Sequence, residues 1–357
     1  MRPALVRDAF ELYDGWVGGR EGSSGVVDLQ KSYYPLIFRY TVRLMGMTEY
    51  ASDSQALQKM QDAFWATQNN SDFFTTIMPW LPQPRLIRRL IGAFTLWRMV
   101  KVTLDQRIKS GAKEDDFAQL LIDEGKAPAS ISRFVIGGLM AGILNTIGTG
   151  AYSIAFLGAD QALQKKAREE LIEGLRACAE RRGDDYDDLT DQQRLERVSL
   201  EEWEADFKTI HLVFKETIRL LDAKGKPRAR LVIEGHPIED DTYIAVAPSA
   251  NLHDADLFAD PLKFDITRYE RGEGPNEYTY VAWGYGRHKC TGMRFAKLET
   301  TLSMAALLLA YDFQSTDDAG KPYTSDTLPL SDLSQNHWRT PTRPLRVRAQ
   351  RRTAEHP

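Results

Sequence analysis

The chain has 357 residues, a length that allows one large domain or two of ordinary size. Hydrophobic residues make up 43% of the chain and charged residues 27%, which excludes a disordered chain, a collagen-like repeat and a coiled-coil rod. The 46 basic and 50 acidic residues give a net charge of −4, without the basic excess typical of nucleic-acid-binding proteins. We therefore expect a globular protein that does not bind nucleic acid.

The cysteines and the start of the chain bear on its location. Cys178 and Cys290 lie far apart in very different surroundings, which favours a reducing compartment over a disulfide framework. The first residues mix Arg, Asp and Glu with apolar side chains, unlike a signal peptide. No uninterrupted apolar run reaches the roughly 18 residues that a membrane span needs. We expect a protein that is soluble or at most peripheral to a membrane.

Helical periodicity dominates the first third of the chain, up to about residue 122. Apolar residues recur at three- and four-residue steps through 29–47 and 86–108. Segment 18–25 (GGREGSSG) is a flexible turn, because the Lys-Ser or Lys-Thr of a phosphate-binding loop does not follow it. Segment 78–84 (MPWLPQP) is broken by prolines and is predicted to end one helix before another begins.

A long apolar helix is predicted from about Ala129 to Gly158, with Ser130 or Ser132 as its cap. Such a helix would extend for about 45 Å. It is apolar nearly all round after Arg133, which indicates burial. Each glycine inside it costs up to about 1 kcal/mol relative to alanine, which indicates the close approach of something flat or bulky. These glycines are Gly137, Gly138, Gly142, Gly148 and Gly150.

The second half of the chain is more varied. Polar helices are predicted over 161–182 and 200–221, and residues 229–247 alternate like short strands around a Gly-His-Pro turn. An irregular stretch from 261 to 280 precedes a final helix from about 291 to 309, and the tail (TRPLRVRAQRR) would add a strand. Together these segments predict a mainly α fold with a small β region (α+β).

The most informative segment is the loop 283–292 (WGYGRHKCTG). Its glycines permit positive φ, so the backbone can fold tightly around one sulfur. Cys290 would stand at a helix N-terminus, where the helix dipole lowers the pKa of a thiol from about 8.5. A lone thiolate without a CxxC motif or paired histidines suits an iron ligand better than tetrahedral zinc. The alternative for a glycine-rich loop with one cysteine is a buried small residue without a ligand.

This loop resembles the haem-binding signature of the cytochrome P450 superfamily. The signature is an aromatic residue, then Gly-x-Gly-x-(Arg or His)-x-Cys-x-Gly, and a small residue four positions later. Trp283 stands where the family usually has Phe. The matching positions are Gly284, Gly286, His288, Cys290, Gly292 and Ala296. The resemblance implies haem b (iron protoporphyrin IX) in the loop 283–292, with Cys290 as the proximal iron ligand.

Two further segments are similar to the same family. Glu216 and Arg219 match its Glu-x-x-Arg motif, which alone indicates no more than an exposed ion pair. Arg268 in FDITRYE occupies the position of a later family arginine. The resemblance implies a buried cluster in which both guanidiniums hold the Glu216 carboxylate and lock the haem loop. It also makes His288, and more loosely Arg230, candidates to contact a haem propionate.

The long glycine-bearing helix takes the place of the family helix over the distal face of the haem. Ala141 and Gly142 match the start of the motif Ala/Gly-Gly-x-acid-Thr. Leu144 stands where the acid should be and Asn145 where the threonine should be, with Thr146 next. The usual acid–alcohol pair for proton delivery is therefore replaced. Asn145 and Thr146 either take over that role through water or are satisfied against the helix backbone.

The resemblance implies a haem-thiolate monooxygenase that inserts one oxygen atom from O₂ into a hydrophobic small molecule, by hydroxylation or epoxidation. Electrons would come from NADPH through NADPH–cytochrome P450 reductase, with Lys215, Arg287 and Lys289 as candidates for a basic docking face. The replacements at Leu144 and Asn145 leave open a peroxide-using or isomerase-type enzyme without a reductase. A truncated, non-catalytic haem-binding fragment is a further alternative.

The resemblance treats residues 1–357 as a single domain and looks most like fungal members, including those of secondary metabolism. It places Met1 in about the family's fourth helix, so we expect the chain to be N-terminally truncated relative to the family. Segment 78–99 would cover the substrate pocket, either as an ordinary amphipathic helix or as a surface that touches a membrane. We expect a cytoplasmic protein, or a peripheral one at the endoplasmic reticulum membrane.

Overall fold

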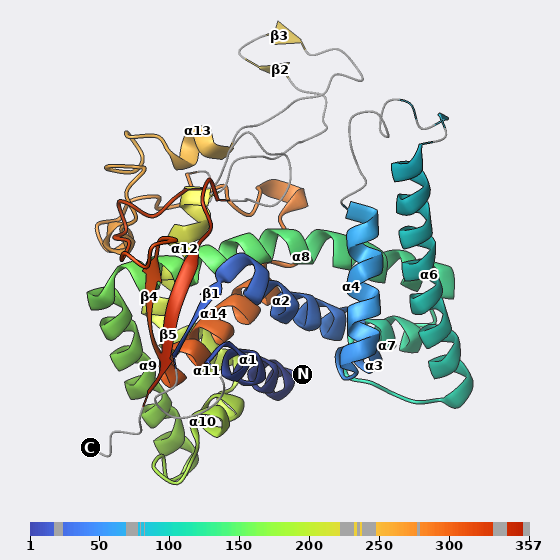
Figure 1. Ribbon diagram of the computed structural model, residues 1–357, viewed down its shortest axis with the longest axis horizontal. Coiled ribbons are helices and arrows are strands. Elements are labelled where there is room, and N and C mark those ends of the chain that lie inside the picture. Colours follow the sequence, from blue (N-terminus) through green and yellow to red (C-terminus); the bar gives the residue numbers. More distant parts are fainter. Residues whose placement is uncertain are drawn as a thin grey trace. The chain divides into compact units, whose positions relative to one another are not determined.

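The computed structural model is mainly helical and contains a small antiparallel sheet (Figure 1), which confirms the predicted fold class. The residues that it describes are 1–17, 24–68, 78, 80–81, 83–221, 232–233, 236–237, 248–276, 279–330 and 341–352. The chain divides into two compact units, which are considered separately below. The first unit comprises residues 1–8 and 34–145, and the second comprises 9–33 and 146–357.

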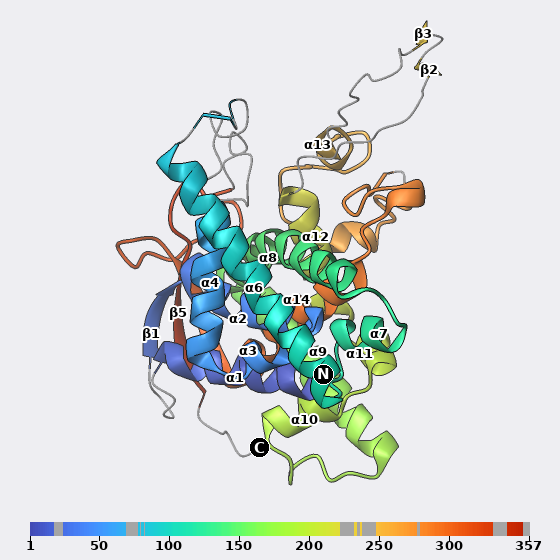
Figure 2. The same cartoon turned by 90° about the vertical axis from the view of Figure 1, so that its right-hand side faces the viewer.

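The first unit is helical in its described residues. It contains the first residues of α1 (Arg2–Val17), most of α2 (Leu29–Met45), α3 (Thr48–Ala51), α4 (Ser54–Gln68), α6 (Pro84–Ser110), α7 (Phe117–Asp123) and the start of α8 (Pro128–Ala159). Helices α4 and α6 lie side by side (Figure 1 and Figure 2). Gly92 allows this approach, because a Cβ there would lie 2.7 Å from the carbonyl oxygen of Ala63. Helices α2 and α6 confirm the two periodic segments predicted in this region.

The second unit carries the sheet. Its further elements are β1 (Ser24–Asp28), α9 (Gln161–Arg182), α10 (Asp191–Arg197), α11 (Leu200–Asp206), α12 (Lys208–Leu221), β2 (Val232–Ile233), β3 (His236–Pro237), α13 (Pro248–Leu252), the 3₁₀ turns η1 (Ile266–Tyr269) and η2 (Gly286–His288), α14 (Met293–Ala310), β4 (Tyr311–Thr316) and β5 (Arg346–Arg351). The strand order is β1-β5-β4, all antiparallel, with Val27 opposite Val347 and Phe313 opposite Ala349. Strand β5 confirms the strand predicted in the tail.

Three local predictions were wrong. Ser24, predicted as part of a turn, begins β1 because it pairs with Gln350 in the sheet. Ser132 does not cap α8, since it lies inside the helix and its hydroxyl donates to the carbonyl of Pro128 at 2.9 Å; Ser130 also lies inside. The helix predicted over 200–221 is two helices, because α11 ends at Asp206 and the backbone of the next residue, Phe207, leaves the helical region at φ −114° and ψ 60°.

Two predicted segments lie largely outside the described residues. Most of the turn 18–25 is not described. Of the predicted strands in 229–247, the structure describes only β2 and β3, which form an antiparallel pair with Ile233 opposite His236.

Helix α8 runs over 32 residues, as its periodicity predicts. Val135, Leu139, Ile143 and Ile147 are fully buried and recur at four-residue steps, which is the stripe of a core helix. By length and composition, α8 is also the one helix among the described residues that is apolar enough to cross a membrane. Because α8 carries this buried stripe, its length and composition alone do not identify it as a membrane-spanning helix.

The glycines of α8 admit bulky neighbours. A Cβ at Gly150 would overlap the ring of Tyr33 and lie 2.7 Å from its hydroxyl oxygen. In the first unit, a Cβ at Gly138 would overlap the side chain of Met45, whereas a Cβ at Gly137 would meet nothing within 4 Å. Tyr33 therefore packs directly on the backbone of α8.

Candidate functional site

The loop 283–292 closes around Cys290. The Cys290 N–H donates to the carbonyl of Trp283 at 2.8 Å. Gly284 and Gly286 have φ of 74° and 71°, a left-handed backbone that glycine adopts without strain. Gly292 is the N-cap residue of α14. The glycines thus occupy the positions where the loop turns, and Cys290 stands just before a helix.

Cys290 presents its thiol at the surface of this loop. It is exposed and forms no disulfide, whereas Cys178 is buried. Within the described part of the chain, no group of three or more His, Cys, Asp or Glu side chains could hold a metal ion. A single accessible thiolate suits an iron whose other ligands come from a porphyrin, and it lacks the partners of a structural zinc site. The donor set therefore fits the haem that the resemblance implies.

The neighbours of Cys290 in the motif differ in their surroundings. Trp283 is half-buried, and its ring lies 6.1 Å from that of Phe214 in α12, so the indole anchors the loop through an aromatic contact. His288 is exposed, as a group that reaches a ligand must be. Ala296 lies in the first turn of α14, where its N–H donates to the carbonyl of Gly292 at 2.9 Å.

Glu216, Arg219 and Arg268 form a fully buried cluster, with every side chain 0% exposed. Arg219 donates from Nε and Nη2 to the two carboxyl oxygens at 2.9 and 2.8 Å. Arg268 donates from Nε to Oε1 at 2.9 Å. The Tyr269 hydroxyl and the Asp265 N–H complete the shell at 2.9 and 3.2 Å. The carboxylate is thus forked by two guanidiniums, an arrangement that compensates its burial.

The same guanidiniums hold the irregular segment that follows α13. Arg219 donates from Nη1 to the carbonyls of Leu252 and Pro261, at 2.7 Å each. Arg268 donates to the carbonyl of Ala259 at 2.8 Å and to that of Lys263 at 3.0 Å. The cluster therefore ties α12 to the chain that leads into the cysteine loop.

The candidate residues of α8 fall in different units. Ala141, Gly142 and Asn145 belong to the first unit, where Asn145 is exposed and its Nδ2 donates to the carbonyl of Ala141 at 3.3 Å. Thr146 belongs to the second unit, is 5% exposed, and is hydrogen-bonded to the carboxyl group of Glu299 in α14. Sequence reasoning missed Glu299. The signal was present, because Glu299 is the one acidic residue of that helix.

The cationic residues predicted to bind a partner or the haem differ in their exposure and contacts. The Lys215 ammonium lies 3.8 Å above the ring of Tyr269 and 5.1 Å from that of Tyr280, and burial lowers its pKa. Arg287 and Lys289 are exposed on the cysteine loop. Arg230 lies outside the described residues.

A groove of about 720 Å³ adjoins Trp283 in the second unit. It is lined by α11, α12, the start of α14 and the segment around Tyr280. Its aromatic side chains are Trp203, Phe214, Tyr280 and Trp283, and its cationic ones are Lys208, Lys215, Arg294 and Lys297. Arg294 is paired with Glu204 at 2.6 Å. The groove thus combines aromatic and cationic side chains with one acidic side chain, Glu204.

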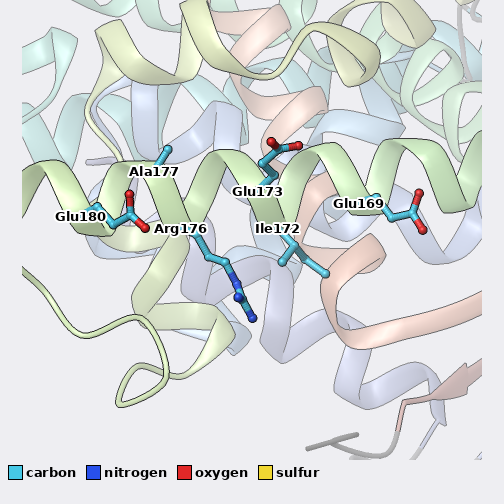
Figure 3. A pocket seen from close by; sticks show the side chains of 6 residues that line it. All are labelled: Glu169, Ile172, Glu173, Arg176, Ala177 and Glu180. Carbon is cyan, nitrogen blue, oxygen red and sulfur yellow. The ribbon is translucent and has the colours of Figure 1, made fainter. Parts of the chain in front are cut away.

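A second hollow, of about 530 Å³, is formed by α9 alone. Figure 3 shows all of its lining side chains on this one helix: Glu169, Ile172, Glu173, Arg176, Ala177 and Glu180. A catalytic or binding site needs polar groups that converge from several elements. This hollow is therefore a helix surface and not a candidate site.

Comparisons with known proteins decide the family. The cytochrome P450 family model matches residues 27–335. The chain belongs to the cytochrome P450 family. Cytochrome P450 monooxygenase AacuE of Aspergillus aculeatus is 28% identical to this P450 over 335 residues, which are 90% of this chain and 65% of the relative. Cytochrome P450 monooxygenase nsrP of Aspergillus novofumigatus is 29% identical over 333 residues, 90% of this chain and 62% of the relative.

The relatives are not confined to fungi. Lanosterol 14-alpha demethylase of Bos taurus is 25% identical to this P450 over 327 residues, 88% of this chain and 60% of the relative. The chain thus spans less than two thirds of the length of these curated relatives. Membership of the family implies a haem cofactor, and the fungal relatives agree with the likeness predicted from the sequence.

Proposed function

We propose that this P450 is a haem-thiolate monooxygenase in which Cys290 binds the iron. The observation that carries the proposal is the accessible Cys290 thiol on a loop closed by the carbonyl of Trp283. The buried cluster around Glu216 braces the chain that precedes this loop. A ligand held in this way is positioned before the cofactor arrives.

Haem, when bound, supplies the activation of O₂ and the insertion of one oxygen atom into a hydrophobic substrate, as hydroxylation or epoxidation. The chain's own residues bind and orient it. Gly284, Gly286 and Gly292 shape the loop, and Ala296 supplies a small surface beside it. We assign His288 and Arg230 to the haem propionates. By resemblance, Ala141, Gly142, Asn145 and Thr146 belong to the oxygen side.

The redox partner that we propose is NADPH–cytochrome P450 reductase. The cationic side chains of the groove beside Trp283, with Arg287 and Lys289 on the adjacent loop, support an acidic docking partner. A peripheral contact with the endoplasmic reticulum membrane is supported by α6. Its apolar residues Leu90, Ile91 and Phe94 are 59%, 60% and 61% exposed, between several arginines of the same helix.

One sequence feature favours a second function. Leu144 and Asn145 replace the acid and the threonine of the oxygen-side motif. This replacement favours an enzyme that uses peroxide, or that rearranges an oxygenated substrate, and such an enzyme needs no reductase. Such an enzyme would turn over without NADPH.

Incorporation of labelled oxygen into the product tests the monooxygenase proposal. The purified chain is incubated with NADPH, reductase, a hydrophobic substrate selected by its effect on the haem absorption spectrum, and ¹⁸O₂. We expect one ¹⁸O atom in the product, no product with Cys290→Ala, and unchanged product with Cys178→Ala. Product from peroxide alone, with none from NADPH and reductase, would overturn the monooxygenase proposal in favour of the second function.

A further inference from the structure

Lys215 of α12 is held between two tyrosine rings of the second unit. Its ammonium nitrogen lies 3.8 Å from the centroid of the Tyr269 ring and 5.1 Å from that of the Tyr280 ring. The side chain is half-buried, and among the described residues its ammonium forms no hydrogen bond or ion pair. The face of an aromatic ring attracts a cation, more strongly where water is excluded. The two rings are therefore the partners of this ammonium in the described part of the chain.

The hydroxyl groups fix both rings against α12. Tyr269 of η1 donates to Oε2 of Glu216 at 2.9 Å, and Tyr280 donates to the backbone carbonyl of Lys215 at 2.7 Å. Each ring is thus bonded to α12 at its hydroxyl end and receives the ammonium on its face. Lys215 therefore joins α12 both to η1 and to the segment that precedes the cysteine loop.

Tyr280 leads directly into the cysteine loop. The next residue, Val281, begins a turn in which its carbonyl accepts from the N–H of Gly284 at 2.9 Å. Trp283 lies within this turn, and its carbonyl accepts from the Cys290 N–H. A displacement of Tyr280 would therefore pass through one short turn to the backbone of Cys290.

Other cationic side chains of the groove beside Trp283 are placed differently. Lys208 and Arg294 are 65% and 64% exposed and pair with the carboxylates of Glu270 and Glu204. Those charges lie in solvent, where a docking partner can reach them. The charge of Lys215 faces two rings instead, so its contacts suit a role inside this chain.

We propose that Lys215 is a positioning residue for Cys290: its ammonium, between the rings of Tyr269 and Tyr280, fixes the entry to the loop 283–292 and so holds the thiolate in place for the iron. The inference rests on the proposed function and deepens it. The role differs from that of the Glu216 cluster, whose arginines hold the carbonyls of residues 252–263.

The carbon monoxide difference spectrum of reduced Lys215→Met tests the proposal. Methionine keeps the apolar contact with the rings and removes the charge, so we expect the share of haem with a thiolate-type band to fall several-fold. Lys215→Arg should restore it, because a guanidinium also stacks on tyrosine. Tyr280→Leu should cause the same loss, and the double variant should lose no more than either single one. A wild-type band in Lys215→Met, or fully additive losses, would overturn the proposal.

Arg194→Met is the matched control for simple destabilisation. It removes a cation that lies 3.8 Å from the ring centroid of Tyr186 in the same unit, remote in sequence from the cysteine loop. We expect this variant to unfold at a lower denaturant concentration and to keep its thiolate-type band. An equal loss of the band in Arg194→Met would reduce the role of Lys215 to general stability.

A readout independent of the haem separates this proposal from the proposed function. Backbone hydrogen exchange at Gly284 and Cys290 of the purified full chain should be several-fold faster in Lys215→Met and unchanged in Arg194→Met. Faster exchange in a protein whose wild type never gives the thiolate-type band would sink the proposed function alone. Unchanged exchange in a protein whose wild type gives that band would sink the role of Lys215 alone.

Discussion

Two fully buried glutamates show how surroundings decide the state of a side chain. Glu216 accepts from two arginines, a tyrosine and a backbone N–H, so its charge is balanced inside the protein. Glu299 has Thr146 and no cation among the residues that the structure describes, and burial raises its pKa. The first glutamate braces the cysteine loop, and the second holds a hydroxyl of α8.

The raised pKa of Glu299 predicts a pH dependence of stability. Above the ordinary value of 4.5 the unfolded chain loses this proton while the folded chain keeps it. The folded state then binds more protons, so the free energy of unfolding falls as pH rises, by up to about 1.4 kcal/mol per pH unit. Glu299→Gln removes this dependence. Urea unfolding of both proteins across a pH series measures it, and parallel pH curves would contradict the assignment.

The arginine cluster predicts a large loss of stability. Arg268→Ala leaves the Glu216 carboxylate short of a partner in the core, and we expect the free energy of unfolding to fall by about 3–5 kcal/mol. Arg271→Ala is the control. That side chain is 48% exposed and pairs with Asp265 and Glu273 in solvent, so its loss should cost far less. Equal losses in denaturant titrations would mean that the buried cluster has no special role.

At the scale of elements, substitutions at two glycines of α8 distinguish the effect of side-chain packing on stability from the effect of helix propensity. Gly150→Ala should destabilise the protein, because the new methyl group overlaps the Tyr33 ring. Gly137→Ala meets open space and should stabilise it by roughly 0.5–1 kcal/mol through helix propensity. Thermal midpoints of the two variants are expected to move in opposite directions. A shift of the same sign would place Tyr33 away from α8.

The helices that the sequence predicts best are those with long apolar periodicity. The bounds of α2, α6, α8 and α14 follow from repeating apolar side chains and from local signals such as Pro84. Strand β1 could not be predicted in the same way, because it is short and begins with the turn formers Ser24 and Gly25, and pairing with β5 makes it a strand. The break at Phe207 could not be predicted either, because no Gly or Pro marks it in the sequence.

At the scale of the whole molecule, the site was predictable where chemistry constrains several positions of one motif. The cysteine loop and the residues of the arginine cluster could be named because several positions resemble the family's motifs, whereas Glu216 and Arg219 alone indicate no more than an exposed ion pair. Glu299 could not be named as the partner of Thr146. Their contact joins residues far apart in the chain, and no local pattern specifies it.

The central claim is that sulfur of residue 290 ligates haem iron, and the carbon monoxide difference spectrum of the reduced protein tests it most directly. We predict the Soret band characteristic of a thiolate-ligated haem in the wild type and in Cys178→Ala, whose thiol is buried. The band should be lost in Cys290→Ala. A wild-type protein that takes up haem without this band, or a Cys290→Ala variant that retains it, would contradict the account.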